Sequence, residues 1–564
     1  PSRRSRRRGR VAGTCRRRVL SVVLCLGVGS LAFNAGWKAY WLHGCMDGCY
    51  EGGLSAVHLA YSGVDAEGNA SGMTVVWTTA QGEAPPVVEF GRSPDDLSSR
   101  AEGTSVRYLD TVHHRASLED LEPGIRLFYR CGNPPPPSEA DASVDFERSP
   151  TFDVSIPAAG GDVEGAAGGY TPAAETQREA GAGTWSEVFS FVSAPAPERW
   201  AGNGPWDRPV SVAVVGDFGL VNAGKTFDRL HQLVEDEEVD FVLHLGDIAY
   251  ADDAFLERPW EFGYEEKWDS FMKKASYDFG SRVPYMVVPG NHEAECHSPA
   301  CLFSSRKTRS LGHFNAYNAR FRMPSLESGA DHGTAMWYSF NVGPVHFVVV
   351  NTETDFPGAS GDHFAWSRGS GNGGFGDQLA WLEEDLAKAD QERDVRPWIV
   401  VSGHRPMYSK GSLARSGQLS DKSETLRQAF EPLLARYKAD VYLCGHVHSF
   451  ERSFPVFEKD IRFAKGSDNT SGGEKDGDGV QLAPASTAMV YDQPSAPVHI
   501  VNGAGGNIEG LSSPKRIRRR AMPHWNAISL KTVAGVGILS FPSMAEMRSQ
   551  FVTSGSPAEV CGLC

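Results

Sequence analysis

Short apolar runs alternate with helical stretches in the carboxy-terminal part of the chain, and several of these runs end in glycine followed by a polar residue. Val210–Val215 and residues 241–245 are each followed by Gly-Asp, and residues 227–234 between them repeat apolar side chains at helical spacing. Further strands are predicted at 285–288, 345–350, 398–401, 441–444 and 498–501. Strands this apolar are buried on both faces, which predicts an α/β domain whose strands are covered by helices or a second sheet.

This α/β domain is predicted to span 209–552. A segment rich in Gly, Asp and Ser, residues 459–486, is predicted to be a flexible insertion, and residues 553–564 are interpreted as a divergent tail without a closing strand.

The pattern before residue 209 is different, because short alternating segments are separated by turn residues. Segments 73–79, 87–91, 126–130 and 185–192 are rich in β-branched and aromatic side chains and predict strands of a β-sandwich over 54–196. Residues 133–184 carry a proline run with many Gly, Ala and Glu, and predict a disordered insertion. No cluster of His, Cys or carboxylates in this region suggests chemistry, so a packing or spacer role is favoured over a binding role.

Residues 1–50 have the layout of a targeting segment. Nine arginines fall in the first eighteen residues, and an apolar run follows at 19–33. This pattern predicts a signal peptide or a signal anchor, with residues 35–42 available to extend a membrane segment to 19–42. We therefore expect entry into the secretory pathway and a secreted, cell-surface or vacuolar protein, either cleaved or anchored.

Composition narrows the remaining function classes. The 564 residues suffice for two domains, the 41% hydrophobic and 22% charged content is typical of soluble globular proteins, and the net charge of −15 argues against nucleic acid as a partner. Ten cysteines fit an oxidising compartment, and the close pairs 45/49, 296/301 and 561/564 could each close a small loop, so the pairing stays open. Asn69 and Asn469 begin glycosylation sequences, which a secreted glycoprotein would use.

Seven potential metal ligands lie on five short segments that follow the predicted strands. These residues are Asp217, Asp247, Tyr250, Asn291, His404, His446 and His448. Strand ends are where ligand sites of open α/β sheets lie, and a preceding glycine lets the backbone turn sharply beside a metal. Carboxylates and imidazoles in this number suit two cations roughly 4 Å apart, which together can bind the oxygens of an in-line displacement at phosphorus. The sequence thus predicts a dinuclear phosphoesterase centre.

At these motifs the sequence resembles the purple acid phosphatases, within the calcineurin-like metallophosphoesterases. The resemblance spans about 55–552 and includes residues 314–317, 320–324, 337–340, 404–408 and 503–506. It implies a fibronectin-III-like amino-terminal sandwich followed by a metallophosphoesterase β-sandwich flanked by helices. It also implies an acid phosphatase that hydrolyses small phosphate monoesters.

The resemblance also implies roles for single residues. Asp217, Tyr250 and His448 would hold Fe(III), Asn291, His404 and His446 would hold a divalent ion (Zn, Mn or Fe), and Asp247 would bridge the two. The hydroxide that the metals generate would attack phosphorus, with His292 orienting the phosphate or protonating the leaving oxygen. Asn291, His292 and Arg405 would contact the substrate, and Glu293 would support His292 or the local backbone.

One departure from the family pattern leaves the substrate open. Well-known plant members carry two histidines shortly after the position of His404, whereas residues 409–415 contain none and offer Lys410 as another phosphate contact. A nucleotide pyrophosphatase or phosphodiesterase on the same centre is therefore the alternative enzyme. A noncatalytic surface binding protein is the alternative from another class, which the intact ligand set argues against. The sequence leaves the oligomeric state undetermined.

Overall fold

The computed structural model describes most of the two predicted domains. The described residues are 53–66, 68–80, 85–109, 111–134, 184–195, 209–257, 263–294, 310–330, 333–359, 373–463, 474–475, 481–482, 491, 494–512, 523–530, 533–554 and 560–563.

The amino-terminal domain contains two antiparallel sheets, as predicted. One has the strand order β1-β2-β6-β5 and the other β4-β3-β7-β8, with β9 also paired to β7. The strands are β1 (Leu54–Val64), β2 (Ala70–Thr79), β3 (Val87–Gly91), β4 (Ser99–Glu102), β5 (Thr104–Tyr108), β6 (Thr111–Leu118), β7 (Arg126–Asn133), β8 (Thr184–Trp185) and β9 (Phe189–Val192). The last strand predicted at 185–192 is divided in two: β8 and β9 both pair with β7, whereas residues 186–188 between them are not part of a strand.

The carboxy-terminal domain is built on two mixed sheets. Their orders are β12-β11-β10-β24-β25-β26 and β13-β14-β15-β16-β22-β17-β23. The strands are β10 (Val210–Val215), β11 (Phe241–His244), β12 (Tyr285–Val287), β13 (Tyr338–Val342), β14 (Val345–Val349), β15 (Trp398–Ser402), β16 (Val441–Cys444), β17 (Phe450–Ser453), β22 (Val498–Asn502), β23 (Asn526–Leu530), β24 (Gly535–Ser543), β25 (Glu546–Thr553) and β26 (Val560–Leu563). Every residue of β10 and β11 is buried, which confirms that these apolar runs are covered on both faces.

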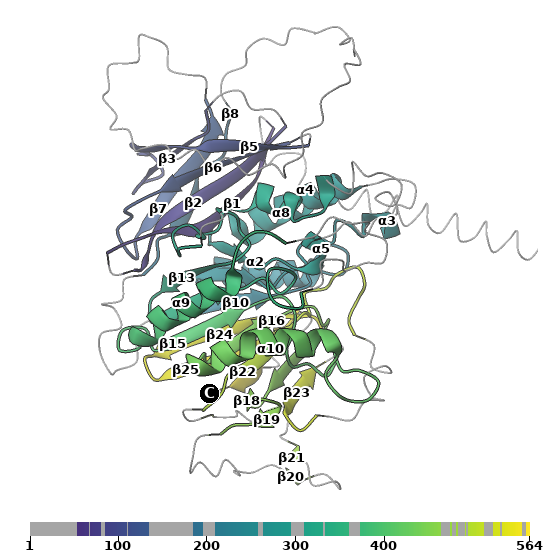
Figure 1. The fold of residues 1–564 in the computed structure, drawn as a ribbon. Coiled ribbons are helices and arrows are strands. Elements are labelled where there is room, and N and C mark those ends of the chain that lie inside the picture. Colours follow the sequence, from purple (N-terminus) through teal and green to yellow (C-terminus); the bar gives the residue numbers. More distant parts are fainter. Residues whose placement is uncertain are drawn as a thin grey trace, which may run out of the picture. The chain divides into compact units, whose positions relative to one another are not determined.

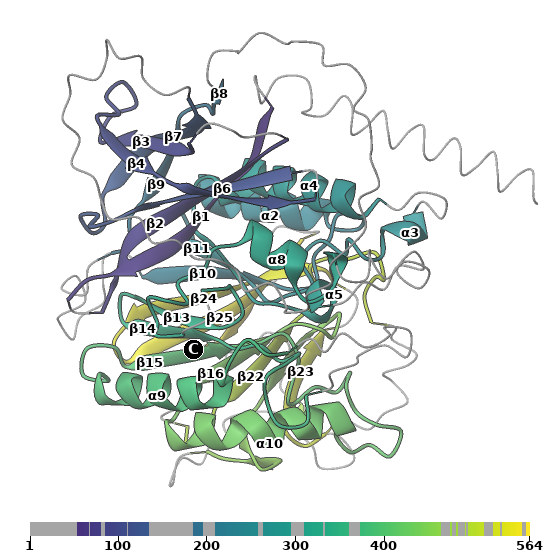
Figure 2. The same cartoon turned by 45° about the horizontal axis from the view of Figure 1, so that its top comes forward.

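The core of this domain lies between the two sheets. Phe241 in one sheet and Phe347 in the other pack their rings edge to face, with 5.1 Å between the ring centroids. Phe450 and Phe551 stack across the same interface, with 4.4 Å between their ring centroids. The helices are α2 (Gly224–Glu235), α3 (Ala254–Glu257), α4 (Tyr264–Ala275) with the π-helical turn η2 (Ser276–Gly280), α5 (Asn291–Ala294), α8 (Asn315–Arg320), α9 (Gln378–Gln391) and α10 (Asp421–Arg436). Figures 1 and 2 show α9 and α10 alongside the seven-stranded sheet, so the predicted sandwich flanked by helices is confirmed.

Polar contacts join the amino-terminal domain to the carboxy-terminal one. Tyr129 donates a hydrogen bond to the Ser281 carbonyl at 2.8 Å. Nε2 of His58 in β1 lies 3.1 Å from the Arg320 carbonyl at the end of α8. These contacts are buried, and buried polar groups are stable only when they are paired in this way.

One predicted modification site is incompatible with the fold. Asn69 is only 5% exposed, and its amide group donates to Asp65 and accepts from Arg396. A glycan on Asn69 would require this buried network to open, so the prediction of an acceptor there is wrong; Asn469 lies outside the described residues.

Several other predictions fall wholly or partly outside the described residues. They are the targeting segment 1–50, most of the insertion 133–184, the cysteine pairs 45/49 and 296/301, and much of 459–486. Within 459–486 the described residues include β19 (Asp460–Ile461), paired with β18 (Val456–Phe457), and β20 (Glu474–Lys475), paired with β21 (Gln481–Leu482). The tail was expected to lack a closing strand, but β26 pairs antiparallel with β25. Among the described helices, none is long and apolar enough to cross a membrane.

Candidate metal centre

The ends of five strands place the predicted ligands in one region of the carboxy-terminal domain. Asp217 follows β10 and Asp247 follows β11, while α5 begins at Asn291 just after β12. His404 follows β15, and His446 follows β16. Parallel pairing of β11 with both β10 and β12, and of β15 with β16, brings these strand ends to common edges.

The backbone at the centre is strained. Asp217, Asp247, Tyr250 and His446 have φ values of 55°, 53°, 50° and 65°, a region that non-glycine residues rarely occupy. Such strain persists only where the surrounding structure enforces it, and it is typical of functional sites.

Two glycines next to the ligands leave space for carboxylates. A Cβ atom on Gly290 would lie 2.3 Å from Oδ1 of Asp247, and one on Gly445 would lie 2.5 Å from Oδ2 of Asp217. The predicted role of glycine at these turns thus has a physical basis, since any side chain would displace a carboxylate from the centre.

The donor atoms of the predicted ligands come together at two points. The first point is formed by Asp217, Tyr250 and His448. Nδ1 of His448 donates to the Gly510 carbonyl at 2.9 Å, so Nε2 is the nitrogen left for a ligand. This Nε2 lies 3.1 Å from the Tyr250 hydroxyl and 3.3 Å from Oδ1 of Asp217.

Asp247, Asn291 and His404 converge on a second point in the same way. Nδ1 of His404 donates to the Leu245 carbonyl at 2.8 Å. The opposite nitrogen, Nε2, lies 3.1 Å from Oδ2 of Asp247 and 3.1 Å from the amide oxygen of Asn291. Two oxygens that carry lone pairs therefore lie within 3.1 Å of the same imidazole nitrogen.

The donor atoms at each of the two points are suited to bind a cation. Buried lone pairs this close repel one another unless a proton or a metal ion lies among them. Burial lowers the pKa of His404, but the Asp247 carboxylate raises it, to about 9. Burial and the Asp217 carboxylate raise the pKa of the Tyr250 phenol well above its usual value, so a strongly charged ion is needed to hold it as phenolate. The donor set of carboxylates, imidazoles, a phenol and an amide suits hard or borderline ions.

His446 belongs to the second point, but one of its nitrogens is already engaged. Asp247, His404 and His446 each offer a ligand atom within 4.8 Å of the others. However, Nη1 of Arg405 donates to Nε2 of His446 at 2.8 Å. Metal binding by His446 therefore requires its Nδ1 atom or a displaced Arg405 guanidinium.

Arg405 is held in place by a carboxylate that sequence reasoning missed. Its Nε donates to both oxygens of the buried Glu353 at 2.8 Å. Arg405, one of the three predicted substrate contacts, lines a cavity beside His446. The other two, Asn291 and His292, are not among the residues that line this cavity. Lys410, the other predicted phosphate contact, is only 6% exposed and also lies outside the cavity lining.

His292 is oriented by a second carboxylate that sequence reasoning missed, Asp252. Nδ1 of His292 donates to Asp252 at 2.8 Å, and its ring packs against the Tyr250 ring at 4.2 Å between centroids. Nε2 is thereby directed toward the centre, 3.9 Å from Oδ2 of Asp247. Burial lowers the pKa of His292, but Asp252 and Asp247 raise it well above its usual value. The ring is thus poised to hold a proton next to the centre.

Glu293 supports the backbone of the centre, which is one of the two roles predicted for it, the other being support of His292. Its buried carboxylate accepts hydrogen bonds from the backbone N–H groups of Asp247 and Ile248 at 2.8 Å and of Gly290 at 2.9 Å. It thus fixes the left-handed turn at Asp247 and the approach of Gly290.

We expect Glu293→Gln to weaken metal binding by about 10- to 100-fold, the usual cost of losing a group that orients a ligand. A glutamine amide has one accepting oxygen, so its NH₂ group would face at least one of these backbone N–H groups. Resistance of bound metal to a graded chelator measures the effect. The exposed Glu384→Gln on α9 is the control, and equal chelator resistance in both variants would contradict the role of Glu293.

Three family models match successive parts of the chain. The purple acid phosphatase N-terminal domain matches residues 55–152, the calcineurin-like phosphoesterase family matches 210–450, and the iron/zinc purple acid phosphatase-like protein C family matches 496–561.

Individual relatives show the same likeness. Human acid phosphatase type 7 is 28% identical over 488 residues, covering 84% of this chain and 82% of its own. An acid phosphatase of Aspergillus ficuum is 29% identical over 522 residues, covering 76% and 74%. The solved structure of a purple acid phosphatase from yellow lupin seeds superposes with a TM-score of 0.59 at 18% identity over 90% of this chain and 74% of that one, which shows a common fold. With the three family matches in order along its length, the chain belongs to the purple acid phosphatases, within the calcineurin-like metallophosphoesterases.

Proposed function

We propose that this acid phosphatase hydrolyses phosphate monoesters at a dinuclear centre that pairs Fe(III) with a divalent ion. In this proposal Asp217, Tyr250 and His448 hold Fe(III), Asn291, His404 and His446 hold a divalent zinc, manganese or iron ion, and Asp247 lies between the two. The observation that carries the proposal is the pair of convergent donor sets, in which His404 and His448 each turn Nε2 toward buried oxygens.

The two ions would supply Lewis acidity toward the phosphoryl oxygens and lower the pKa of bound water. Residues of the chain would do the rest. Asp252 keeps Nε2 of His292 directed at the centre, where it can donate a proton to the leaving oxygen. Glu353 keeps Arg405 at the wall of the cavity, where its positive charge favours an anionic ester.

The alternative enzymatic function is hydrolysis of phosphate diesters at the same centre. Two features favour a diesterase: residues 409–415 contain no histidine, and Lys410 is buried. This segment therefore offers few side chains that could donate a hydrogen bond to phosphate. Rates with 4-nitrophenyl phosphate and bis(4-nitrophenyl) phosphate separate the two activities, and a higher kcat/KM for the diester would replace the monoesterase proposal.

The visible spectrum tests the ferric assignment. Iron-bound tyrosinate gives the charge-transfer band that names the family, so the metal-replete protein is expected to be purple. Tyr250→Phe removes only the hydroxyl that lies 3.1 Å from Nε2 of His448 and should abolish the band while iron stays bound through the remaining ligands. Iron content measured on the same samples is the control. A colourless, iron-free and active wild-type protein would overturn the ferric assignment and place Tyr250 outside the metal shell.

A further inference from the structure

The glycine-rich segment 503–512, which follows β22, passes beside two of the predicted ligands of the first point, Asp217 and His448. A Cβ atom on Gly503 would lie 2.6 Å from Oδ2 of Asp217, so glycine leaves room there for the carboxylate. Farther along the segment, the backbone N–H of Ser512 donates to the His448 carbonyl at 2.8 Å. The segment therefore contacts both ligands.

Asn507, in the middle of this segment, is only 1% exposed and uses both ends of its amide group. Nδ2 donates to the Asp217 carbonyl at 3.1 Å, and Oδ1 accepts from the Gly510 N–H at 3.1 Å. The Gly510 carbonyl in turn accepts from Nδ1 of His448 at 2.9 Å. One amide group thus connects the backbone of Asp217 with the residue that orients His448.

These partners fix the orientation of the Asn507 amide. A carbonyl group can only accept a hydrogen bond, and a backbone N–H can only donate one. Turning the amide over would place its oxygen against the Asp217 carbonyl and its NH₂ group against the Gly510 N–H, so both bonds would be lost. The observed orientation is therefore the one that satisfies both neighbours.

The backbone of Asp217 depends on support of this kind. Asp217 is fully buried and has a φ of 55°. A residue other than glycine keeps this conformation only where its surroundings enforce it, and a buried carbonyl needs a hydrogen-bond partner. The same turn brings Oδ1 of Asp217 to 3.3 Å from Nε2 of His448. Loss of the bond from Asn507 would therefore loosen the turn that holds this carboxylate at the first point.

An exposed residue just before α2, Asn222, holds Asn507 from another side. Nδ2 of Asn222 donates to the Asn507 carbonyl at 2.8 Å, and the Asn222 N–H donates to the Gly506 carbonyl at 3.0 Å. These two bonds fix the backbone from which the Asn507 side chain extends.

The second point is oriented by other groups. The Leu245 carbonyl accepts from Nδ1 of His404, and the Glu293 carboxylate accepts from the Asp247 N–H. Asn507 contributes to neither of these bonds, so its effect should fall mainly on the first point.

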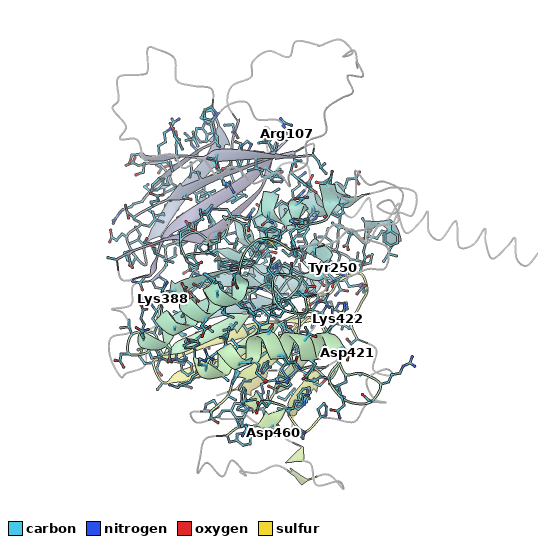
Figure 3. All side chains as sticks on the ribbon, in the orientation of Figure 1. Arg107, Tyr250, Lys388, Asp421, Lys422 and Asp460 are labelled. Atoms are coloured by element: carbon cyan, nitrogen blue, oxygen red, sulfur yellow. The ribbon has the colours of Figure 1, made fainter. Side chains whose placement is uncertain are left out.

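We propose that Asn507 is a positioning residue that sets how Asp217 and His448 face each other, and that it thereby controls how firmly the ion of the first point is held. This inference rests on the proposed function, which assigns Fe(III) to that point. Figure 3 labels Tyr250, which marks the first point because its hydroxyl lies 3.1 Å from Nε2 of His448. Asn507 acts through the ligands, since its amide is bonded to backbone groups.

The test uses protein loaded with Fe(III) and Zn(II), so that the ions of the two points can be counted separately. Asn507→Leu keeps the approximate size of the side chain and removes both amide bonds. Iron is expected to leave this variant at chelator concentrations about 10- to 100-fold lower than in the wild-type protein, the usual cost of losing a group that orients a ligand. Release of zinc should stay close to that of the wild-type protein. The purple band should fade in step with the iron content.

Asn222→Ala is a milder form of the same change. Because Asn222 is exposed, this variant removes a bond to the Asn507 backbone without opening the core. Iron should again leave at lower chelator concentrations than in the wild-type protein, by a smaller factor, while zinc release stays unchanged. Asn222→Ala thus decides the question even where Asn507→Leu fails to fold.

Asn341→Leu is the matched control, because the Asn341 amide also bonds at both ends. It donates to the Gly68 carbonyl at 2.6 Å, and its oxygen lies 2.7 Å from Nδ1 of His346. These partners lie at the junction of the two domains, so Asn341→Leu should release both ions as the wild-type protein does. A merely structural loss would lower its thermal midpoint without changing its iron content.

The outcomes separate this inference from the function on which it rests. Unchanged iron release in Asn507→Leu, or in Asn222→Ala where Asn507→Leu does not fold, would overturn the role of Asn507. Equal acceleration of iron and zinc release would overturn it as well, because the effect would not be confined to the first point. A wild-type protein that takes up zinc but no iron would instead overturn the ferric assignment, and this inference with it.

Discussion

Asp247→Asn is expected to lose both metal ions or to lower turnover by about a thousandfold or more, a loss of roughly 4 kcal/mol of transition-state stabilisation. Asp247 is 1% exposed and serves the centre with both oxygens. Oδ1 accepts from the backbone N–H of His292 at 2.9 Å, and Oδ2 lies 3.1 Å from Nε2 of His404. Asparagine keeps the shape but removes the negative charge, and it can present only one accepting oxygen.

Metal content and kcat measured on the same preparation test this prediction. Asp385→Asn is the matched control, since Asp385 is also buried and hydrogen-bonded, to Ser339 and His346, but takes no part in the centre. Its thermal midpoint should fall while its metal content stays normal. An Asp247→Asn protein with full metal content and normal turnover would show that Asp247 does not bridge the ions.

The fold of the carboxy-terminal domain was predictable because its strands are apolar on both faces. Val210–Val215 is a strand with the predicted bounds, and the predicted run at 241–245 ends one residue after β11. The amino-terminal sandwich was harder. In β5 only Tyr108 is buried, so its sequence shows too little apolar alternation to be recognised as a strand. Edge strands such as β26 are stabilised by pairing with a neighbour, which local sequence does not reveal.

The predicted ligands were recognisable because each comes shortly after the end of a strand, where the chain turns. The residues that orient Arg405 and His292 carry weaker signals. Glu353 follows β14 closely and could have been found by the same rule, but no glycine precedes it. Asp252 lies two residues after Tyr250 in a loop, and its role depends on His292, which is forty residues away in the sequence. Contacts of this range depend on the tertiary fold, so one sequence alone leaves them open.

His292→Ala is expected to keep both metal ions and to lose about 10²- to 10⁴-fold in kcat with an alkyl phosphate, the usual contribution of a positioned general acid. The loss should be smaller with 4-nitrophenyl phosphate, because 4-nitrophenolate leaves without needing a proton. This dependence on the leaving group distinguishes proton donation from simple binding of phosphate, which would affect both substrates equally.

Asp252→Asn tests the same arrangement without removing the imidazole. Asparagine can still accept from Nδ1 of His292, but it lacks the charge that favours the protonated ring. We therefore expect the kcat of Asp252→Asn to lie between that of the wild-type protein and that of His292→Ala. The loss of kcat should again be larger with the alkyl phosphate than with 4-nitrophenyl phosphate. Normal hydrolysis of the alkyl phosphate by His292→Ala across the pH range would show that the proton comes from elsewhere. The Asp252–His292 pair would then be a structural support for the ring that packs against Tyr250.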